Sequence, residues 1–426
     1  MKTKRIELEN IQGNVLGGFN KDFQDFVFAE VVDAVKARAW VREHAPQVAS
    51  AKQVVAFNNK FRKLKDMGVA KPEHFISASW LNIAFSFAGL VKLGFTREEL
   101  GGLPVAFEAS MESRAATVGD IGPSAPAKWL APFAPSQRSS LHVLLIVAAD
   151  HESDLIDLKA GLVDQPAFTA AFRIVGTEKG RTRVDQVGHE HFGFKDGVSQ
   201  PGIRGLDLPD DPVADPDQGH PGQDLLWPGE FVLGYPTQIP TAAPGHDGPN
   251  PNPGPPSETG NPAWTNDGSF LVFRRLQQDV PAFHEQLAVL AKNSGQTVDL
   301  LGAKLVGRYR SGCPLEKLTS QASNAPASPT DPAEASPLLA DSDLLNNDFE
   351  FGEDALGERC PLAAHIRKVY PRDEDTGLGA DSESATQTHR LLRRGIPYGA
   401  SFGAEVGGEA AAPRGLLFLA YQKDIE

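Results

Sequence analysis

Three short segments carry side chains that could do chemistry together. His365 lies in CPLAAHIRKVYPR, where Ala363 and Ala364 would let a flat macrocycle approach the imidazole, and the cations that follow could meet carboxylate arms. Asp196 lies in GFKDGVSQPG, whose glycines would let an acid be held against a ligand with little steric cover. Arginines cluster in THRLLRRGIPYGA, and one of them turned inward would need an anionic or strongly polar partner, because a guanidinium keeps its charge.

Each segment also has an ordinary structural explanation. A histidine in the setting of His365 is more often a buried core residue than a ligand. An Asp-Gly pair is above all a turn signal, and arginines at a helix end commonly favour the C-terminal dipole. His189 and His191 alternate as on a strand, a spacing that can bind metal, but no third ligand is identifiable nearby. Taken separately, the segments leave these alternatives open.

The elements that must position these residues follow from apolar patterns. Short apolar runs rich in β-branched or aromatic residues predict strands, and amphipathic spacing predicts helices. The predicted strands are Val27–Val32, Trp80–Phe87, Leu141–Val147, Phe231–Gly234, Phe270–Phe273 and Leu416–Tyr421, and the predicted helices are Glu152–Val163 and Val280–Leu290. No Gly-rich phosphate loop follows a strand, so we expect an α+β fold with antiparallel sheets. The element order of residues 27–185 is loosely repeated in 231–421, which indicates two similar halves.

The centre of the chain has an unusual composition. Residues 201–262 contain 15 of the 33 prolines, and from Gly205 to Phe273 there are ten acidic residues and no Lys or Arg. Proline fixes φ and removes a hydrogen-bond donor, so we predict a long irregular loop. A solvated loop is the simple explanation, and the alternative is an entrance whose negative field collects cations such as Mn²⁺ or cationic substrates. A second polar stretch, Ser320–Asp341, is predicted to be a mobile insert.

Composition excludes several classes of protein. The 426 residues suffice for two domains, and 41 basic against 55 acidic residues give a net charge of −14, which repels nucleic acid. Two cysteines, Cys313 and Cys360, form neither a disulfide framework nor a CxxC zinc pattern. The apolar segment Ala78–Val91 is too short to cross a membrane, and no apolar stretch follows the basic N-terminus. We therefore expect a cytoplasmic protein with no membrane partner.

Seven motifs in this order resemble those of the dye-decolorizing peroxidase family over nearly the whole length. They are IQGNVLGGF, GFKDG, GSFLVFRRL, VGRYRSGCPL, CPLAAHIRK, RLLRRGIPYG and GLLFLAYQ. The resemblance implies two ferredoxin-like modules, residues 1–190 and 191–426, with one haem b per chain in a cavity associated with the C-terminal module. It also implies a haem-dependent peroxidase that uses hydrogen peroxide to oxidise dyes, phenolic and other aromatic reductants through a ferryl intermediate.

The same resemblance implies residue roles. His365 matches the histidine that ligates the iron, Asp196 matches the distal acid of the GxxDG motif, and Arg393 matches the distal arginine. The other residues expected at the cofactor are Leu416 and Phe418, similar to the apolar residues that roof the distal pocket, and Arg367 and Arg274, weaker candidates for contacts with the haem propionates.

Two expectations concern what the resemblance does not assign. Relatives usually continue past the strand similar to GLLFLAYQKDIE and supply there an acidic partner for the histidine, so either the chain is a piece of a longer protein or its own partner for His365 is built differently. The alternative function is a haem-binding protein for storage or iron release, in which peroxidase activity is incidental. A homo-oligomer is a further possible state.

Overall fold

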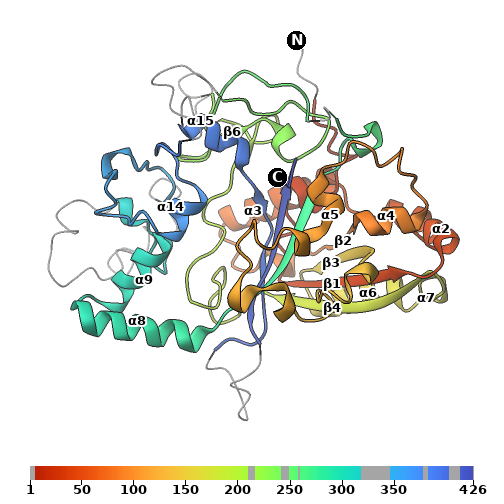
Figure 1. Ribbon diagram of the computed structural model, residues 1–426, viewed down its shortest axis with the longest axis horizontal. Coiled ribbons are helices and arrows are strands. Elements are labelled where there is room, and N and C mark those ends of the chain that lie inside the picture. Colours follow the sequence, from red (N-terminus) through yellow and green to blue (C-terminus); the bar gives the residue numbers. More distant parts are fainter. Residues whose placement is uncertain are drawn as a thin grey trace.

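The computed structural model describes residues 5–209, 216–240, 249–257, 260–317, 346–377, 382–402 and 413–425. Its α-helices are α1 (Gly13–Leu16), α2 (Ala34–His44), α3 (Ala51–Asp66), α4 (Phe87–Leu93), α5 (Val105–Ser113), α6 (Glu152–Val163), α7 (Pro166–Ala171), α8 (Val280–Ser294), α9 (Val298–Val306), α14 (His365–Val369) and α15 (Ser382–Thr386). Its strands are β1 (Phe23–Val31), β2 (Ser79–Phe85), β3 (Val143–Ala149), β4 (Phe172–Arg181), β5 (Gly202–Ile203), β6 (Leu225–Leu226), β7 (Phe270–Gln277), β8 (Leu392–Arg393), β9 (Ile396–Tyr398) and β10 (Gly415–Gln422). Two antiparallel sheets form the centre of the fold (Figure 1), which confirms the α+β class.

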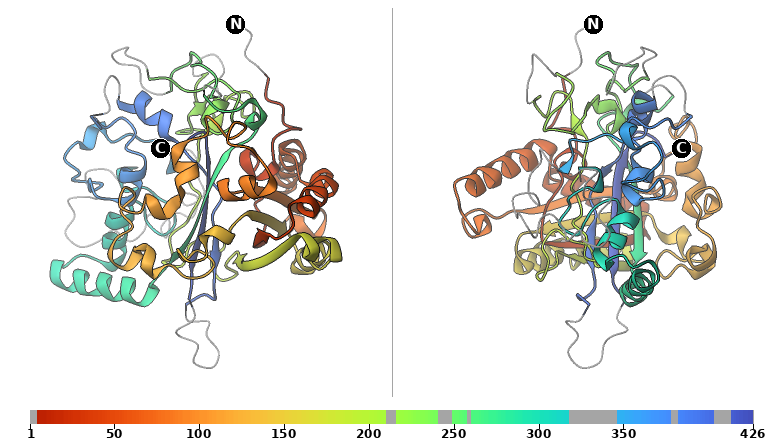
Figure 2. Two further views of the ribbon diagram at one scale, coloured as in Figure 1. Left: turned by 45° about the vertical axis from the view of Figure 1, so that its right-hand side comes forward. Right: turned by 90° about the vertical axis from the view of Figure 1, so that its left-hand side faces the viewer.

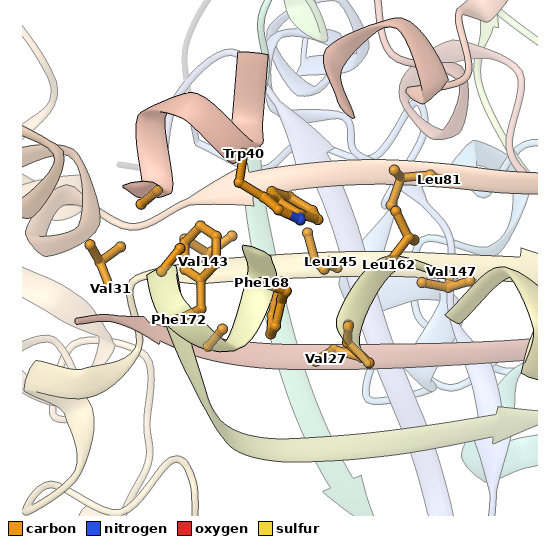
Figure 3. Packing of buried hydrophobic residues seen from close by; sticks show 14 of the residues in the cluster. Val27, Val31, Trp40, Leu81, Val143, Leu145, Val147, Leu162, Phe168 and Phe172 are labelled. Carbon is orange, nitrogen blue, oxygen red and sulfur yellow. The ribbon is translucent and has the colours of Figure 1, made fainter. Parts of the chain in front are cut away.

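The first sheet comes from the N-terminal half and has the strand order β2-β3-β1-β4. Helices α2, α6 and α7 pack on one of its faces and bury a cluster that includes Trp40, Leu145, Phe168 and Phe172 (Figure 3). The ring of Trp40 meets those of Phe168 and Phe172 edge to face, at centroid distances of 5.3 and 5.5 Å. The chain order is that of a ferredoxin-like module, with the additional helices α4 and α5 between β2 and β3.

The second sheet comes from the C-terminal half, with the order β7-β10-β8 and with β9 also pairing to β10. Helix α8 follows β7 directly and begins where the Asp279 side chain accepts a hydrogen bond from Ala282 N. It ends at Gly295, whose φ of 66° is the left-handed conformation that glycine adopts most easily. Figure 2 shows α8, α9 and α14 grouped on one side of this sheet.

The two sheets pack face to face and share one hydrophobic core. The ring of Phe273 on β7 lies 5.4 Å from that of Phe26 and 5.1 Å from that of Phe28, both on β1. Leu417 and Leu419 on β10 are fully buried in the same core. Because side chains alternate along a strand, Leu416, Phe418 and Ala420 face the opposite side of the second sheet.

Most of the predicted elements are confirmed, and one is wrong. The helix Glu152–Val163 matches α6, and five predicted strands fall on β1, β2, β3, β7 and β10. Phe231–Gly234 is a turn region, in which Leu233 N bonds to Gly268 O. Its residues are buried in the core that includes α1, so burial explains the apolar run that resembled a strand.

Other expectations about organisation have mixed outcomes. The described parts of 201–262 form two-residue strands, turns and irregular chain, as expected of a proline-rich segment, whereas Ser320–Asp341 lies outside the described residues. The last strand of the first sheet ends at Arg181, and a domain boundary between residues 190 and 191 stays a prediction. Among the described residues, no helix has the length and apolar character needed to cross a membrane.

Candidate active site

Asp196 lies in a compact loop, residues 188–200, that follows the first module. Its backbone N donates to Gly188 O at 2.8 Å, and its Oδ1 accepts from Gly197 N at 2.6 Å. Gly197 has a φ of 72°, a conformation that residues with side chains rarely adopt. The Asp196 side chain is still 38% exposed. The chain therefore bends at Gly197, directly after Asp196, and the carboxylate stays accessible.

Arg393 is the arginine of the RLLRRGIPYG segment that reaches this acid. Its Nη1 lies 3.6 Å from Asp196 Oδ1, and its Nη2 donates to Ser199 O at 2.6 Å. The neighbouring arginines bind elsewhere. Arg390 pairs with a buried aspartate at 2.9 Å, and Arg394 donates to three backbone carbonyls of α1. Only Arg393 among these three residues shares a site with the acid.

His365 is the first residue of α14, and its side chain is accessible to solvent. Desolvation by the surrounding protein is the main cause that lowers the pKa of its imidazole. The positive charge of Arg393 lowers the pKa further, and the negative charge of Asp196 acts in the opposite direction. The imidazole thus lies within electrostatic reach of both groups, and the lowered pKa favours its neutral form, the form that can ligate a metal.

The register of β10 places the two predicted apolar residues beside Arg393. Arg393 is paired with Ala420, and side chains two and four positions away on β10 point to the same face. Leu416 and Phe418 are therefore on the face of the sheet that carries Arg393, and both are partly exposed. The opposite face is the core shared by the two sheets. The structure so brings Asp196, Arg393 and these two strand residues to one side of the second sheet.

Arg367 is bound within the protein, and its contact with a haem propionate stays a prediction. Its side chain has no exposed surface, and its guanidinium pairs with Asp354 at 3.0 Å and with Glu374 at 2.6 Å. Its Nη1 also donates to Cys360 O at 2.6 Å. These bonds use the guanidinium inside the protein, so Arg367 fixes the short helix α14 that begins at His365.

Arg274 is also bound within the protein. It is paired with Phe418 across the sheet, and its guanidinium forms an ion pair with the buried Asp120 of the N-terminal half. Both Arg274 and Phe418 line a cavity of about 1470 Å³ near α5, whose described lining includes neither Asp196 nor His365. The structure gives no support to a propionate contact by Arg274, because Asp120 already neutralises its charge.

Three residues of this site were missed by the sequence patterns. Ser199 supplies the carbonyl that holds the Arg393 guanidinium, and Gln200 bonds to the backbone of Arg393 through both atoms of its amide. Glu190 accepts two backbone N–H bonds within the same loop. Ser199 and Gln200 lie inside GFKDGVSQPG, but polar residues in a loop carry no signal of their partner until the chain is folded.

A metal site formed by several protein side chains is not found in the described part of the chain. No group of three or more His, Cys, Asp or Glu side chains there could hold a metal ion, so an Mn²⁺ site has no support from the described residues. His189 bonds to the carbonyls of Val187 and Arg310, and His191 bonds to that of Tyr398. Both histidines are therefore held by backbone carbonyls in this fold.

The donor set at His365, Asp196 and Arg393 fits a haem iron. A neutral imidazole is a common axial ligand of haem, and a carboxylate with a guanidinium can move a proton and stabilise negative charge on a bound oxidant. The residue before the imidazole, Ala364, is small and fully buried, so it places no bulk next to the ligand. The residues present are consistent with the cofactor.

Known proteins resemble the chain over almost its full length. A family model described as the DyP dimeric alpha+beta barrel domain matches residues 10–184. The dye-decolorizing peroxidase msp1 of Mycetinis scorodonius is 32% identical over 99% of this chain and 71% of its own length. The structure of an ancestral D-type dye-decolorizing peroxidase has a TM-score of 0.74 and 31% identity, over 99% of this chain and 81% of that one. A dye-decolorizing peroxidase in complex with 2,6-dimethoxyphenol has a TM-score of 0.72 and 28% identity, over 99% and 82% of the two chains.

Fold, site and relatives together define the class of protein, a haem peroxidase built from two α+β modules. The chain belongs to the dye-decolorizing peroxidase family. The alternative of a haem-storage or iron-release protein is not favoured, because the similar proteins are named as peroxidases.

Proposed function

We propose that the chain binds one haem b through His365 and uses Asp196 and Arg393 to reduce hydrogen peroxide, with aromatic compounds as electron donors. The observation that carries this proposal is the 3.6 Å contact between Asp196 and Arg393 within electrostatic reach of the His365 imidazole. The haem, when bound, supplies the redox chemistry. A phenolic donor is supported by the relative that has been solved with 2,6-dimethoxyphenol.

Asp196 is the group that would move the proton. Cleavage of peroxide needs a proton to leave one oxygen and to arrive on the other, and a carboxylate within reach can shuttle it directly or through one water. Among the described residues, the contacts of this carboxylate with Gly197 N and Arg393 both involve Oδ1. Oδ2 is then the atom with capacity to accept the proton and return it.

Arg393 has an electrostatic role in this scheme. Its guanidinium can stabilise negative charge that develops on the departing oxygen. Its bond to Ser199 O fixes the direction of the guanidinium before peroxide arrives. Such preorganised donors typically contribute about 10²–10³-fold in rate.

Two sets of variants test the proposal. His365→Ala is expected to abolish the Soret band after reconstitution with haem b, whereas Asp196→Ala and Arg393→Leu are expected to retain it. In stopped-flow mixing with peroxide, the rate constant of the haem spectral change should fall on the order of 10²-fold in each of the last two variants. Unchanged rate constants in both variants would contradict the assigned roles.

Three finer expectations stay predictions. Cell fractionation would test the cytoplasmic location. Light scattering of the purified protein would test the homo-oligomer. An Mn²⁺ requirement would be tested by adding the metal to the peroxidase assay.

A further inference from the structure

The loop 188–200 contacts both members of the acid–arginine pair, although residues 196 and 393 are far apart in sequence. We propose that Glu190 and Gln200 are positioning residues of this site, with Glu190 fixing the segment that carries Asp196 and Gln200 fixing the backbone of Arg393. The inference rests on the proposed function of Asp196 and Arg393. It identifies the residues that hold these two side chains in place. Neither residue is part of the family motif quoted above as GxxDG.

Glu190 folds the first half of the loop onto its own carboxylate. Oε1 accepts from Phe194 N and Oε2 accepts from Phe192 N, both at 2.7 Å. Oε2 also accepts from the side-chain amide of Gln278, the residue that follows strand β7. The backbone of Glu190 closes the same turn, since its N donates to Phe194 O at 3.0 Å. Asp196 follows only two residues after Phe194.

These bonds make Glu190 a positioning group and not a second acid. Both of its oxygens already accept backbone N–H bonds, and Oε2 also accepts from Gln278, so the carboxylate is engaged in holding the loop. Burial raises the pKa of the Glu190 carboxyl, and the negative charge of Asp196 raises it further, while the bonds from Phe192 and Phe194 oppose the change. A carboxylate is the only side chain that can accept two separate N–H bonds through two equivalent oxygens at this distance from the backbone.

Gln200 holds Arg393, because its side-chain amide bonds to the backbone of Arg393 as a neighbouring strand would. Its Nε2 donates to Arg393 O at 2.9 Å, and its Oε1 accepts from Arg393 N at 3.3 Å. Strand β8 contains only two residues, and β10 occupies the neighbouring side of Arg393. The amide of Gln200 therefore satisfies backbone groups of Arg393 that a further strand would otherwise pair. Next to it, Ser199 O accepts from the guanidinium, so backbone and side chain of Arg393 are held by consecutive residues.

Backbone hydrogen bonds also hold the loop 188–200 on either side of Asp196. Lys195 N donates to Arg310 O at 3.0 Å, and Asp196 N donates to Gly188 O, so the acid is held from both sides of the turn. Small displacements matter in such a site, because a shift of about 1 Å can cost on the order of 10²-fold in rate. Loosening either end of the loop should thus slow the reaction with peroxide without removing a reacting group.

Double-mutant cycles separate positioning from general stabilisation, because a residue that acts through a partner loses its effect when the partner is gone. Glu190→Gln replaces one acceptor oxygen by an NH₂ group that opposes a backbone N–H, and Gln200→Leu keeps the side-chain volume but removes both bonds. Each is expected to lower the stopped-flow rate constant with peroxide on the order of 10–100-fold, with haem content and the KM for the aromatic reductant unchanged. Gln186→Leu, an exposed glutamine of the preceding segment, is the matched control and should react like the parent.

The cycle then predicts partner-specific losses. Glu190→Gln should change the rate constant less than about 2-fold in the Asp196→Ala background, and Gln200→Leu should do likewise in the Arg393→Leu background. Equal losses with and without the partner would overturn the inference, as would parental rates in both single variants. If Asp196→Ala and Arg393→Leu themselves react at the parental rate, the proposed function fails instead.

A measurement on the haem-free chain gives an independent readout. Amide hydrogen exchange at Phe192 or Phe194 should be faster in Glu190→Gln than in the parent, because the amide keeps one acceptor oxygen for these two N–H groups. Exchange in α6 of the first module should be unchanged, which controls for global destabilisation. Unchanged protection at Phe192 and Phe194 would contradict the assigned role of Glu190.

Discussion

Arg367 shows how a single charged residue can support a site through contacts within the protein. It lies two positions after His365 and has no exposed side-chain surface. Asp354, with 3% of its side chain exposed, and Glu374 both pair with its guanidinium. Since His365 begins the five-residue helix that contains Arg367, the buried ion pairs determine where the imidazole is placed.

Removal of this arginine should destabilise the chain more than it weakens any direct haem contact. Arg367→Met leaves the buried carboxylate of Asp354 without its partner, and the free energy of unfolding should fall by about 3–5 kcal/mol. Urea denaturation of the haem-free chain measures the change. The control is Arg173→Met, which breaks an ion pair whose arginine is 67% exposed and should cost about 0–1 kcal/mol. A loss of haem affinity with unchanged stability would instead favour a propionate contact.

One face of strand β10 packs in the core, and its other face belongs to the candidate active site. Leu417 and Leu419 are fully buried between the two sheets, whereas Leu416 and Phe418 are partly exposed on the face that carries Arg393. This division follows from the period of two along a strand, so neighbouring residues have different surroundings. One element therefore contributes to both the core and the candidate active site.

The two faces of β10 should respond differently to truncation. Leu419→Ala creates a cavity in the shared core and should lower the free energy of unfolding by about 2–5 kcal/mol. Phe418→Ala removes a larger side chain but from a partly exposed position, so its effect on the haem-free chain should be less than half as large. Chemical denaturation of both variants measures this difference. Equal losses would show that Phe418 belongs to the core between the sheets.

The whole molecule contains a buried carboxyl whose protonation couples stability to pH. Glu230 has 1% of its side chain exposed, and burial raises its pKa to about 7, with Lys423 and the N–H of Gln238 opposing the rise. The folded state then binds a proton more tightly than the unfolded state. Its contribution to stability is largest below the unfolded pKa of about 4.5 and is lost as the pH rises through about 7.

A neutral substitute at this position should remove part of that pH dependence. Glu230→Gln is expected to raise the thermal midpoint relative to the parent at pH 8 more than at pH 5, because only at pH 8 does the parent carry the buried charge. Calorimetry of the haem-free chain at the two pH values is the test. Glu353→Gln, at a side chain that is 93% exposed, is the control. The same difference from the parent at both pH values would contradict the assignment to Glu230.

Local patterns in the sequence determined much of this protein. Alternating apolar runs and amphipathic spacing predicted five strands and the helix α6, since each depends on neighbours along the chain. The apolar run Phe231–Gly234 was mistaken for a strand, because complete burial of a turn produces the same composition. The family and the class of reaction also followed from contiguous motifs, including GFKDG around Asp196.

Only the tertiary structure decided which residues meet. Three arginines in RLLRRGIPYG have similar local surroundings, and the fold alone assigns Arg393 to the acid and Arg394 to the carbonyls of α1. The ion pairs of Arg367 were hidden for the same reason, since its carboxylate partners become neighbours only after folding. Charge and hydrogen-bond partners are set by distances across the folded chain, whereas strand and helix patterns are set by neighbours in sequence.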